Sequence, residues 1–114
     1  MAEAIRDKEG FYPGSRAWRN NNPGNLKFAD QKGTIGYDNK HFARFKTMQD
    51  GWNALIRQIE LVATNKSKAY PKDCTMLQFF ETYAPSFEND TNSYAKEVCA
   101  KVGVELSTKL SELL

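Results

Sequence analysis

Apolar residues recur at helical spacing in the middle of the chain. They form one continuous stripe of Trp52, Leu55, Ile56, Ile59, Val62 and Ala63. Thr47 is a favourable N-cap before this stripe, and Asp50 at the third helical position complements the helix dipole. The pattern therefore predicts a helix from Thr47 to about Thr64, which we expect to be the central helix of the core.

Two further helices are predicted after it, each with a start signal and a stop signal. Thr75 can cap the first helix, which stops before Pro85 because the proline ring disfavours helical geometry in the residue before it. Asp90 or Thr91 caps the second helix, and Gly103 ends it. Both segments carry apolar residues at helical spacing, so both are expected to pack against the core.

Shorter helical patterns lie at the two ends of the chain. Residues 2–8 contain no Gly or Pro, and Gly10 ends the helix predicted there, which leaves Glu9 on its last turn. Near the C-terminus, Ser107 is expected to cap a final amphipathic turn. The apolar residues of that turn are Leu106, Leu110, Leu113 and Leu114.

The pattern changes from helical to extended over about residues 25–45. The extended segments are residues 25–29, 34–38 and 41–45, separated by residues typical of turns. We therefore expect a small, irregular antiparallel sheet in this region.

Composition agrees with a folded protein of the α+β class. The 114 residues are 40% hydrophobic, 26% charged and 12% aromatic, which excludes the disordered and collagen-like classes. The length allows one hydrophobic core but not a second. We expect a single domain, residues 1–114, that is mostly α, with four to six helices and the small sheet.

Charge, cysteine and histidine contents narrow the possible chemistry. Residues 1–46 carry nine Lys/Arg against five Asp/Glu, so this half suits an anionic polymer, either nucleic acid or bacterial cell wall. Cys74 and Cys99 lie in apolar helical patterns, which favours buried free thiols over a single disulfide. With His41 as the single histidine, we expect no zinc site, and no other metal or organic cofactor is implied.

A candidate site follows the first predicted helix. Glu9 precedes Phe11, Tyr12 and Trp18, and a loop rich in Asn, Pro and Gly comes next. Partial burial by aromatic rings raises the pKa of a carboxyl group toward the range of a general acid. Glu9 is therefore the candidate catalytic acid.

Several short motifs follow one another along the chain. They are Glu9-Gly10-Phe11, Ser15, Arg19-Asn20-Asn21-Asn22-Pro23-Gly24-Asn25-Leu26, Phe42-Ala43-Arg44-Phe45 with Thr47, Gly51 and Ala54, Tyr83-Ala84-Pro85, Asn89-Asp90-Thr91 and Tyr94. In this order they resemble the small lysozyme-like domains of phage virion and lysis proteins, which are akin to soluble lytic transglycosylases. The similarity covers nearly the whole chain, and the run from Arg19 to Leu26 is its most specific part.

The resemblance implies a lysozyme-like fold and an enzyme that cleaves peptidoglycan. Glu9 matches the family's catalytic acid, which protonates the glycosidic oxygen between N-acetylmuramic acid and N-acetylglucosamine. The residues implied to bind the sugars through amide groups or aromatic rings are Asn21, Asn22, Asn25, Tyr37, Tyr83 and Tyr94.

One departure from the phage lysozyme pattern bears on the mechanism. That pattern places an aspartate nine residues after the glutamate, and here Trp18 occupies the position. A two-carboxylate hydrolase needs a partner roughly 5–10 Å from the acid, and Asp30 and Asp38 are the candidates for this second carboxylate. A lytic transglycosylase needs no such partner, because the C6 hydroxyl of the sugar closes a 1,6-anhydro ring. We therefore favour a transglycosylase over a two-carboxylate muramidase.

Two rival functions remain at this stage. One is a non-catalytic module that binds cell wall or a virion protein, and the other is nucleic-acid binding, which is disfavoured because the Lys and Arg residues are scattered. We expect a monomer that acts on peptidoglycan glycan strands, with other virion or lysis proteins as further partners. No segment has the length of a membrane span, and the acidic N-terminus lacks the apolar core of a signal peptide. We therefore expect no membrane insertion, and delivery to the cell wall, in the periplasm or outside the cell, by a phage particle, a lysis system or another route without a signal peptide.

Overall fold

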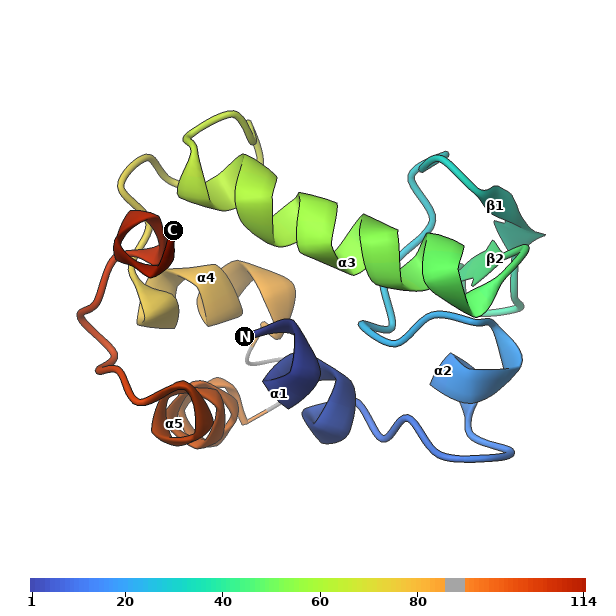
Figure 1. Ribbon diagram of the computed structural model, residues 1–114, viewed down its shortest axis with the longest axis horizontal. Helices are drawn as coiled ribbons and strands as arrows, with labels where there is room; N and C mark the ends of the chain where they lie inside the picture. The colour runs from blue at the N-terminus through green and yellow to red at the C-terminus, as the bar shows by residue number, and fades with distance from the viewer. Residues whose placement is uncertain (86–89) are drawn as a thin grey trace. The chain divides into compact units, whose positions relative to one another are not determined.

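The structure of the protein, a computed structural model, describes residues 1–85 and 90–114. The elements, in chain order, are α1 (Ala2–Lys8), α2 (Arg16–Arg19), β1 (Thr34–Tyr37), β2 (Ala43–Phe45), α3 (Met48–Ala63), α4 (Met76–Tyr83), α5 (Thr91–Val102) and the 3-10 helix η1 (Leu110–Leu113) (Figure 1). This confirms the predicted α+β class and the predominance of helix. Asn89, which belongs to one of the sequence motifs, lies outside the described residues.

The chain divides into two compact units. The N-terminal unit comprises residues 2–57, and the C-terminal unit comprises residues 58–114 together with Met1, so the boundary falls within α3. The sequence predicted a single domain over residues 1–114, and this stays a prediction. We describe the two units one at a time.

The N-terminal unit begins with the predicted first helix. In α1, the amide of Glu9 still donates to the carbonyl of Ile5 at 2.9 Å, and Gly10 then leaves helical geometry with φ 75°. The four-residue helix α2 lies where the sequence predicted only a loop. Ser15 starts it, because its hydroxyl accepts a hydrogen bond from the amide of Trp18 at 3.2 Å. This cap was missed because so short a helix has no apolar period.

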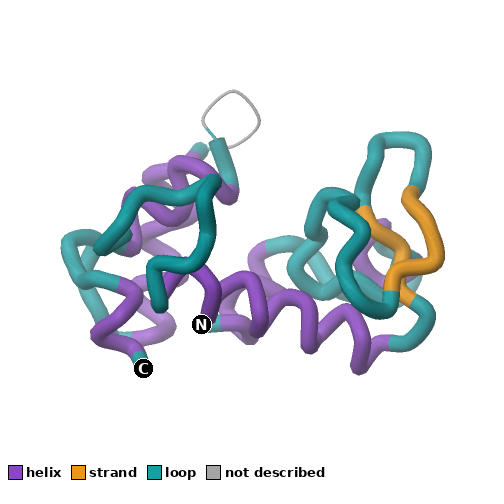
Figure 2. Tube along the Cα trace, turned by 90° about the horizontal axis from the view of Figure 1, so that it is seen from above, coloured by secondary structure: helices purple, strands orange, loops and turns teal. Residues whose placement is uncertain are grey.

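The sheet of the N-terminal unit has two antiparallel strands, β1 and β2 (Figure 2). Tyr37 pairs with Ala43, and an irregularity of register lies between Thr34 and Gly36. The first predicted extended segment is not a full strand, because it joins through a single bridge between Lys27 and Phe42. The prediction of a small, irregular antiparallel sheet is therefore confirmed, with fewer strand residues than expected.

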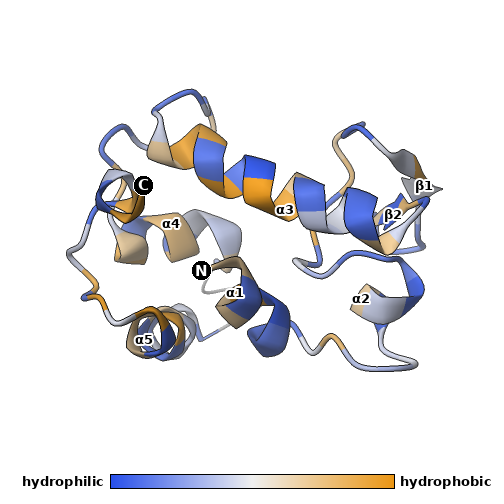
Figure 3. Ribbon diagram, in the orientation of Figure 1, coloured by the Kyte–Doolittle hydropathy of each residue, from blue (hydrophilic) through white to orange (hydrophobic). Residues whose placement is uncertain are grey.

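The long helix α3 follows its predicted start and end closely. Thr47 accepts a hydrogen bond from the amide of Asp50 at 3.1 Å, and its own hydroxyl donates to the Asp50 carboxylate at 2.9 Å. Figure 3 shows hydrophobic and hydrophilic residues alternating along this helix. Leu55, Val62 and Ala63 from the predicted stripe are buried.

The C-terminal unit is built on apolar packing between helices. Its fully buried large side chains are Met76, Phe79, Phe80, Val62, Val98 and Leu110. Thr75 forms a capping box with Gln78 at the start of α4, and Asp90 caps α5 by accepting a hydrogen bond from the amide of Ser93. Both predicted caps are confirmed, and Gly103 ends α5 as predicted, with φ 82°.

The C-terminal segment differs from the prediction. Ser107 does not cap the last turn, because η1 begins after Lys109 without a side-chain cap. Residues 108–110 instead bond to the chain at the start of α4: the carbonyl of Thr108 accepts from the amide of Met76 at 2.8 Å, and the amide of Leu110 donates to the carbonyl of Cys74 at 2.9 Å. Backbone pairing over this long sequence separation carries no local signal, which explains the error.

The two cysteines of the C-terminal unit are buried free thiols, as the sequence favoured. Burial raises the pKa of both Cys74 and Cys99.

Among residues 1–85 and 90–114, no helix is long and apolar enough to cross a membrane. The same residues contain no cluster of three or more His, Cys, Asp or Glu side chains suited to hold a metal ion.

Candidate functional site

Glu9 lies in the turn that follows α1 and is partly buried. It stands in the chain between Arg6 and Phe11, which both line a pocket of about 210 Å³. The other residues that line this pocket are Pro23, Met48, Gln49 and Trp52. The guanidinium of Arg6 lies over the ring of Trp52, 5.6 Å from its centroid, so the pocket has a positive charge beside an aromatic wall.

The three aromatic rings expected near Glu9 differ in exposure. Phe11 is partly buried, whereas Tyr12 is 63% and Trp18 46% exposed. Exposed rings shield a carboxylate from water less than buried rings do. Of the three, Phe11 is therefore the ring with the greatest capacity to desolvate this turn.

Asn22 lies at the centre of the Asn-rich loop and is fully buried. Its side-chain nitrogen donates to the carbonyls of Leu26 and Ala43, and its side-chain oxygen accepts from the amide of Leu26, all at 2.9 Å. The side chain thus joins its own loop to β2. These bonds give Asn22 a structural role, and none of its surface is exposed to a ligand.

Asn21 and Gly51 account for two further contacts of the Asn-rich loop. Asn21 has φ 52°, and its side-chain nitrogen donates to the carbonyl of Phe45 at 3.1 Å. Gly51 on α3 lies against the same loop, because a Cβ atom there would overlap the Asn21 carbonyl oxygen and lie 3.0 Å from Pro23. A glycine at position 51 therefore allows α3 to approach the loop closely.

Asn25 has a different environment from Asn21 and Asn22. Its backbone is also left-handed, with φ 49°. Its side-chain oxygen is buried and has no hydrogen-bond partner among the described residues. A buried acceptor without a partner is uncommon in folded proteins. Of the three predicted amides, Asn25 thus retains an unused hydrogen-bonding atom.

Asp38 is the more constrained of the two candidate second carboxylates. It accepts hydrogen bonds from Arg16 at 2.8 Å, from the Asn20 side chain at 3.0 Å, and from the amides of Lys40 and Phe42 at 2.9 and 3.0 Å. Burial alone would raise its pKa, but these bonds and the positive charge of Arg16 lower the pKa from 3.8 to about 2. Asp38 is therefore ionised at neutral pH and holds the turn after β1 in place.

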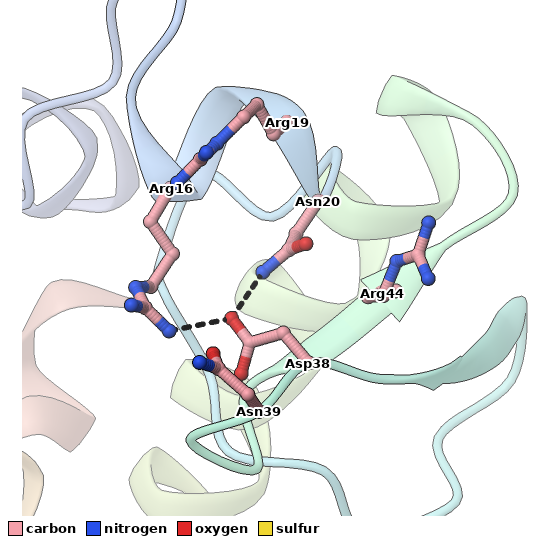
Figure 4. Close-up of a pocket in the computed structure, with 6 residues that line it drawn as sticks. All are labelled: Arg16, Arg19, Asn20, Asp38, Asn39 and Arg44. Atoms are coloured by element: carbon pink, nitrogen blue, oxygen red, sulfur yellow. Dashed lines mark hydrogen bonds and ion pairs between the residues drawn. The ribbon is translucent and has the colours of Figure 1, made fainter.

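The Arg16, Asn20 and Asp38 side chains converge in a second pocket, of about 270 Å³ (Figure 4). Arg16 and Asn20 come from α2 and the residue that ends it, and Asp38 comes from the loop after β1. The remaining residues that line this pocket are Arg19, Asn39 and Arg44. Sequence reasoning did not find the Arg16–Asp38 ion pair, because the two residues are 22 positions apart and neither lies in a periodic pattern.

Asp30, the other candidate second carboxylate, is exposed and lies in an irregular segment before β1, with φ 54°.

Tyr37 is 54% exposed at the end of β1. Its ring lies 4.3 Å from that of His41 and 5.1 Å from that of Phe28, so it belongs to a small aromatic cluster beside the sheet. Tyr37 thus presents an aromatic surface to solvent.

Tyr83 and Tyr94 belong to the C-terminal unit. Tyr94 is 3% exposed, and its ring lies 4.8 Å from that of Phe80. Tyr83 is partly buried and stacks on Phe79 at 5.2 Å. Both rings take part in the core of that unit, and the burial of Tyr94 leaves little of its surface for a ligand.

The predicted site residues are thus divided between the two units. Those in the N-terminal unit are Glu9, Asn21, Asn22, Asn25, Asp30, Tyr37 and Asp38. Comparisons of the chain with protein-family models, with curated proteins and with solved structures found no match.

Proposed function

We propose that the protein has a lysozyme-like fold and cleaves peptidoglycan glycan strands between N-acetylmuramic acid and N-acetylglucosamine, with Glu9 as the general acid. The observation that carries this proposal is the partial burial of Glu9 in the turn directly after α1, where it lies in the chain between Arg6 and Phe11, two residues that line a pocket. The small sheet and the Asn-rich loop belong to the same compact unit. A partly buried carboxylate on such a turn can deliver a proton to a bound polymer.

We favour a lytic transglycosylase mechanism. Glu9 donates its proton to the glycosidic oxygen, and the bond from that oxygen to C1 of N-acetylmuramic acid breaks. The C6 hydroxyl of the same sugar then bonds to C1, and its proton passes to the Glu9 carboxylate, which restores the acid. This reaction needs one carboxylate, and its products are a free 4-hydroxyl end and a 1,6-anhydro end.

The environment of the two aspartates supports this choice. Asp38 accepts four hydrogen bonds from its own unit, which suits a residue that fixes a turn. Asp30 is exposed in an irregular segment before β1. A two-carboxylate muramidase is the alternative, and Asp38 favours it in one respect, because a carboxylate with a pKa of about 2 is ionised as a nucleophile must be.

The proposal is tested by the release of soluble fragments from purified peptidoglycan by the wild type and by Glu9→Gln. We expect the substitution to lower the rate by about 100-fold or more, because a positioned general acid contributes about that much. Glu3→Gln is the matched control, since it makes the same change at an exposed position of α1, the helix that Glu9 follows. Equal rates for Glu9→Gln and Glu3→Gln would contradict catalysis by Glu9, and no release by the wild type would favour a module that only binds.

A further inference from the structure

We propose that the pocket lined by Arg16, Arg19, Asn20, Asp38, Asn39 and Arg44 binds a polyatomic anion with carboxylate or phosphate chemistry. We call it the arginine pocket. It lies entirely within the N-terminal unit, and it shares no lining residue with the pocket lined by Arg6, Phe11 and Trp52. The inference does not depend on the catalytic role proposed for Glu9.

The charges of the arginine pocket do not cancel. Three guanidinium groups line it against the single carboxylate of Asp38, and that carboxylate is already paired with Arg16. Arg19 and Arg44 are exposed, and their side chains make no hydrogen bond or ion pair with any described residue. The pocket therefore carries excess positive charge, which attracts an anion.

The pocket also has a rigid base. Arg16 and Asp38 have side chains only 29% and 16% exposed, and the Asn20 side chain donates to the same Asp38 oxygen as Arg16 does (Figure 4). Arg16 is further held by the ring of Phe42, whose centroid lies 5.4 Å from its guanidinium carbon. A guanidinium fixed in this way loses little conformational entropy when it binds a ligand.

The donors that remain at this base indicate the class of ligand. The Arg16 guanidinium has five N–H donors, and Nη1 bonds to Asp38, so other donors stay available in the pocket. Planar guanidinium groups match carboxylate and phosphate groups through paired hydrogen bonds. In Figure 4, Arg44 extends from β2 with its guanidinium directed away from the Asp38 carboxylate, and it lines the same pocket without pairing with that carboxylate.

The test uses the full-length protein and inorganic phosphate as the probe. Sodium phosphate is titrated at constant ionic strength, set with sodium chloride, while NMR follows the arginine side-chain Nε–Hε signals. We expect the signals of Arg16, Arg19 and Arg44 to shift and to reach saturation. Arg57, an exposed residue of α3 that does not line the pocket, serves as the internal reference. Shifts that do not saturate, or that are equal at Arg57, would overturn the proposal.

Variants then show whether the effect belongs to this pocket. The double variant Arg19→Gln/Arg44→Gln is expected to weaken phosphate binding by about tenfold or more. The loss of one hydrogen bond to a charged group is enough to lower affinity by about that factor. Arg57→Gln together with Lys46→Gln removes the same charge from the same unit outside the pocket and is expected to leave binding unchanged. Equal weakening in the two double variants would show that phosphate responds to the net charge of the protein, and it would contradict binding at the arginine pocket.

A second titration with sodium acetate separates the two sources of the anion. Saturable shifts with acetate alone identify a carboxylate ligand, and saturable shifts with phosphate alone identify a phosphate ligand. Both titrations are repeated on Glu9→Gln, whose binding should equal that of the wild type. Failure of both anions to bind would overturn this inference while leaving the glycosidase proposal intact.

Discussion

The two compact units of the protein are stabilised by different interactions. The N-terminal unit depends on polar side chains that bond to backbone groups, with Asn22 and Asp38 at the centres of two such networks. The C-terminal unit depends on apolar packing, in which Phe79 and Phe80 meet edge to face with ring centroids 5.0 Å apart. The N-terminal unit also buries Ile5, Phe45 and Leu55, so its side-chain hydrogen bonds to backbone act in addition to apolar packing.

The comparison shows how side chains can fix the conformation of a loop. Four polar or small residues of the N-terminal unit hold backbone groups in place or allow a close approach, namely Asn21, Asn22, Asp38 and Gly51. In our proposal Glu9 performs the chemistry. We therefore expect substitutions of residues that hold the backbone to lower stability, and substitution of Glu9 to lower activity. We also expect the losses of stability to differ between the two units.

The largest loss of stability is expected from Phe80→Ala in the C-terminal unit. Phe80 is fully buried and contacts the rings of Phe79 and Tyr94, so its removal leaves a cavity. We expect the free energy of unfolding to fall by about 4 kcal/mol, measured by urea denaturation. Leu114→Ala is the control, because Leu114 is 73% exposed and should change stability little. Similar losses for both variants would contradict the packed core.

Gly51→Ala tests the contact between α3 and the Asn-rich loop. Alanine is the better helix former, so helix propensity alone would make the substitution stabilising. The added Cβ would overlap the carbonyl oxygen of Asn21, and we expect a loss of about 3 kcal/mol from overpacking. Arg57→Ala, at an exposed position of the same helix, is the control. A stabilised Gly51→Ala variant would show that the loop does not lie against α3 as described.

Asn22→Ala measures the polar network of the loop. The substitution removes three hydrogen bonds and leaves buried backbone groups with fewer partners. We expect a loss of about 2–3 kcal/mol in the free energy of unfolding. The exposed Asn39 supplies the control substitution Asn39→Ala, which should cost little. If Asn22→Ala were as stable as that control, the polar account of the N-terminal unit would fail.

The smallest effect is expected from Asp38→Asn, and it depends on pH. Because folding lowers the pKa of Asp38 from 3.8 to about 2, the ionised carboxylate adds stability that is present above pH 3.8 and lost as the pH falls through about 2. Asp38→Asn should therefore be less stable than the wild type at neutral pH by about 1–2 kcal/mol. The difference should shrink as the pH falls from about 4 to about 2. A difference that is independent of pH would contradict the role of the ionised form.

The sequence predicted the helical parts of the fold better than the loop region. Thr75, Asp90 and Gly103 carry their structural information within one helical turn, so their roles follow from spacing. The Arg16–Asp38 ion pair and the pairing of Thr108 with Met76 join residues distant in the chain, and no local pattern reports them. The prediction that Ser107 caps the last turn was wrong for the same reason. The local spacing of the leucines indicated a helix there and gave no sign of the backbone pairing with a distant segment.

The candidate site shows the same limit. The position of Glu9 after a short helix followed from Gly10 and the absence of Gly or Pro before it. The sequence could not distinguish amides that face a ligand from amides that bond to backbone, because both occur in Asn-rich turns. Asn22 is of the second kind, and the unpaired side-chain oxygen of Asn25 separates it from its neighbours.

In our proposal Glu9 acts without a second carboxylate, while Asp38 holds the turn after β1 in place. The mass of the muropeptides that the wild-type protein releases from purified peptidoglycan tests this proposal. We expect 1,6-anhydro ends, which make each product lighter by one water molecule than its hydrolysed counterpart. Ordinary reducing ends would contradict the single-carboxylate mechanism and return Asp38 or Asp30 to the active site. A digest that releases no fragments would contradict cleavage itself.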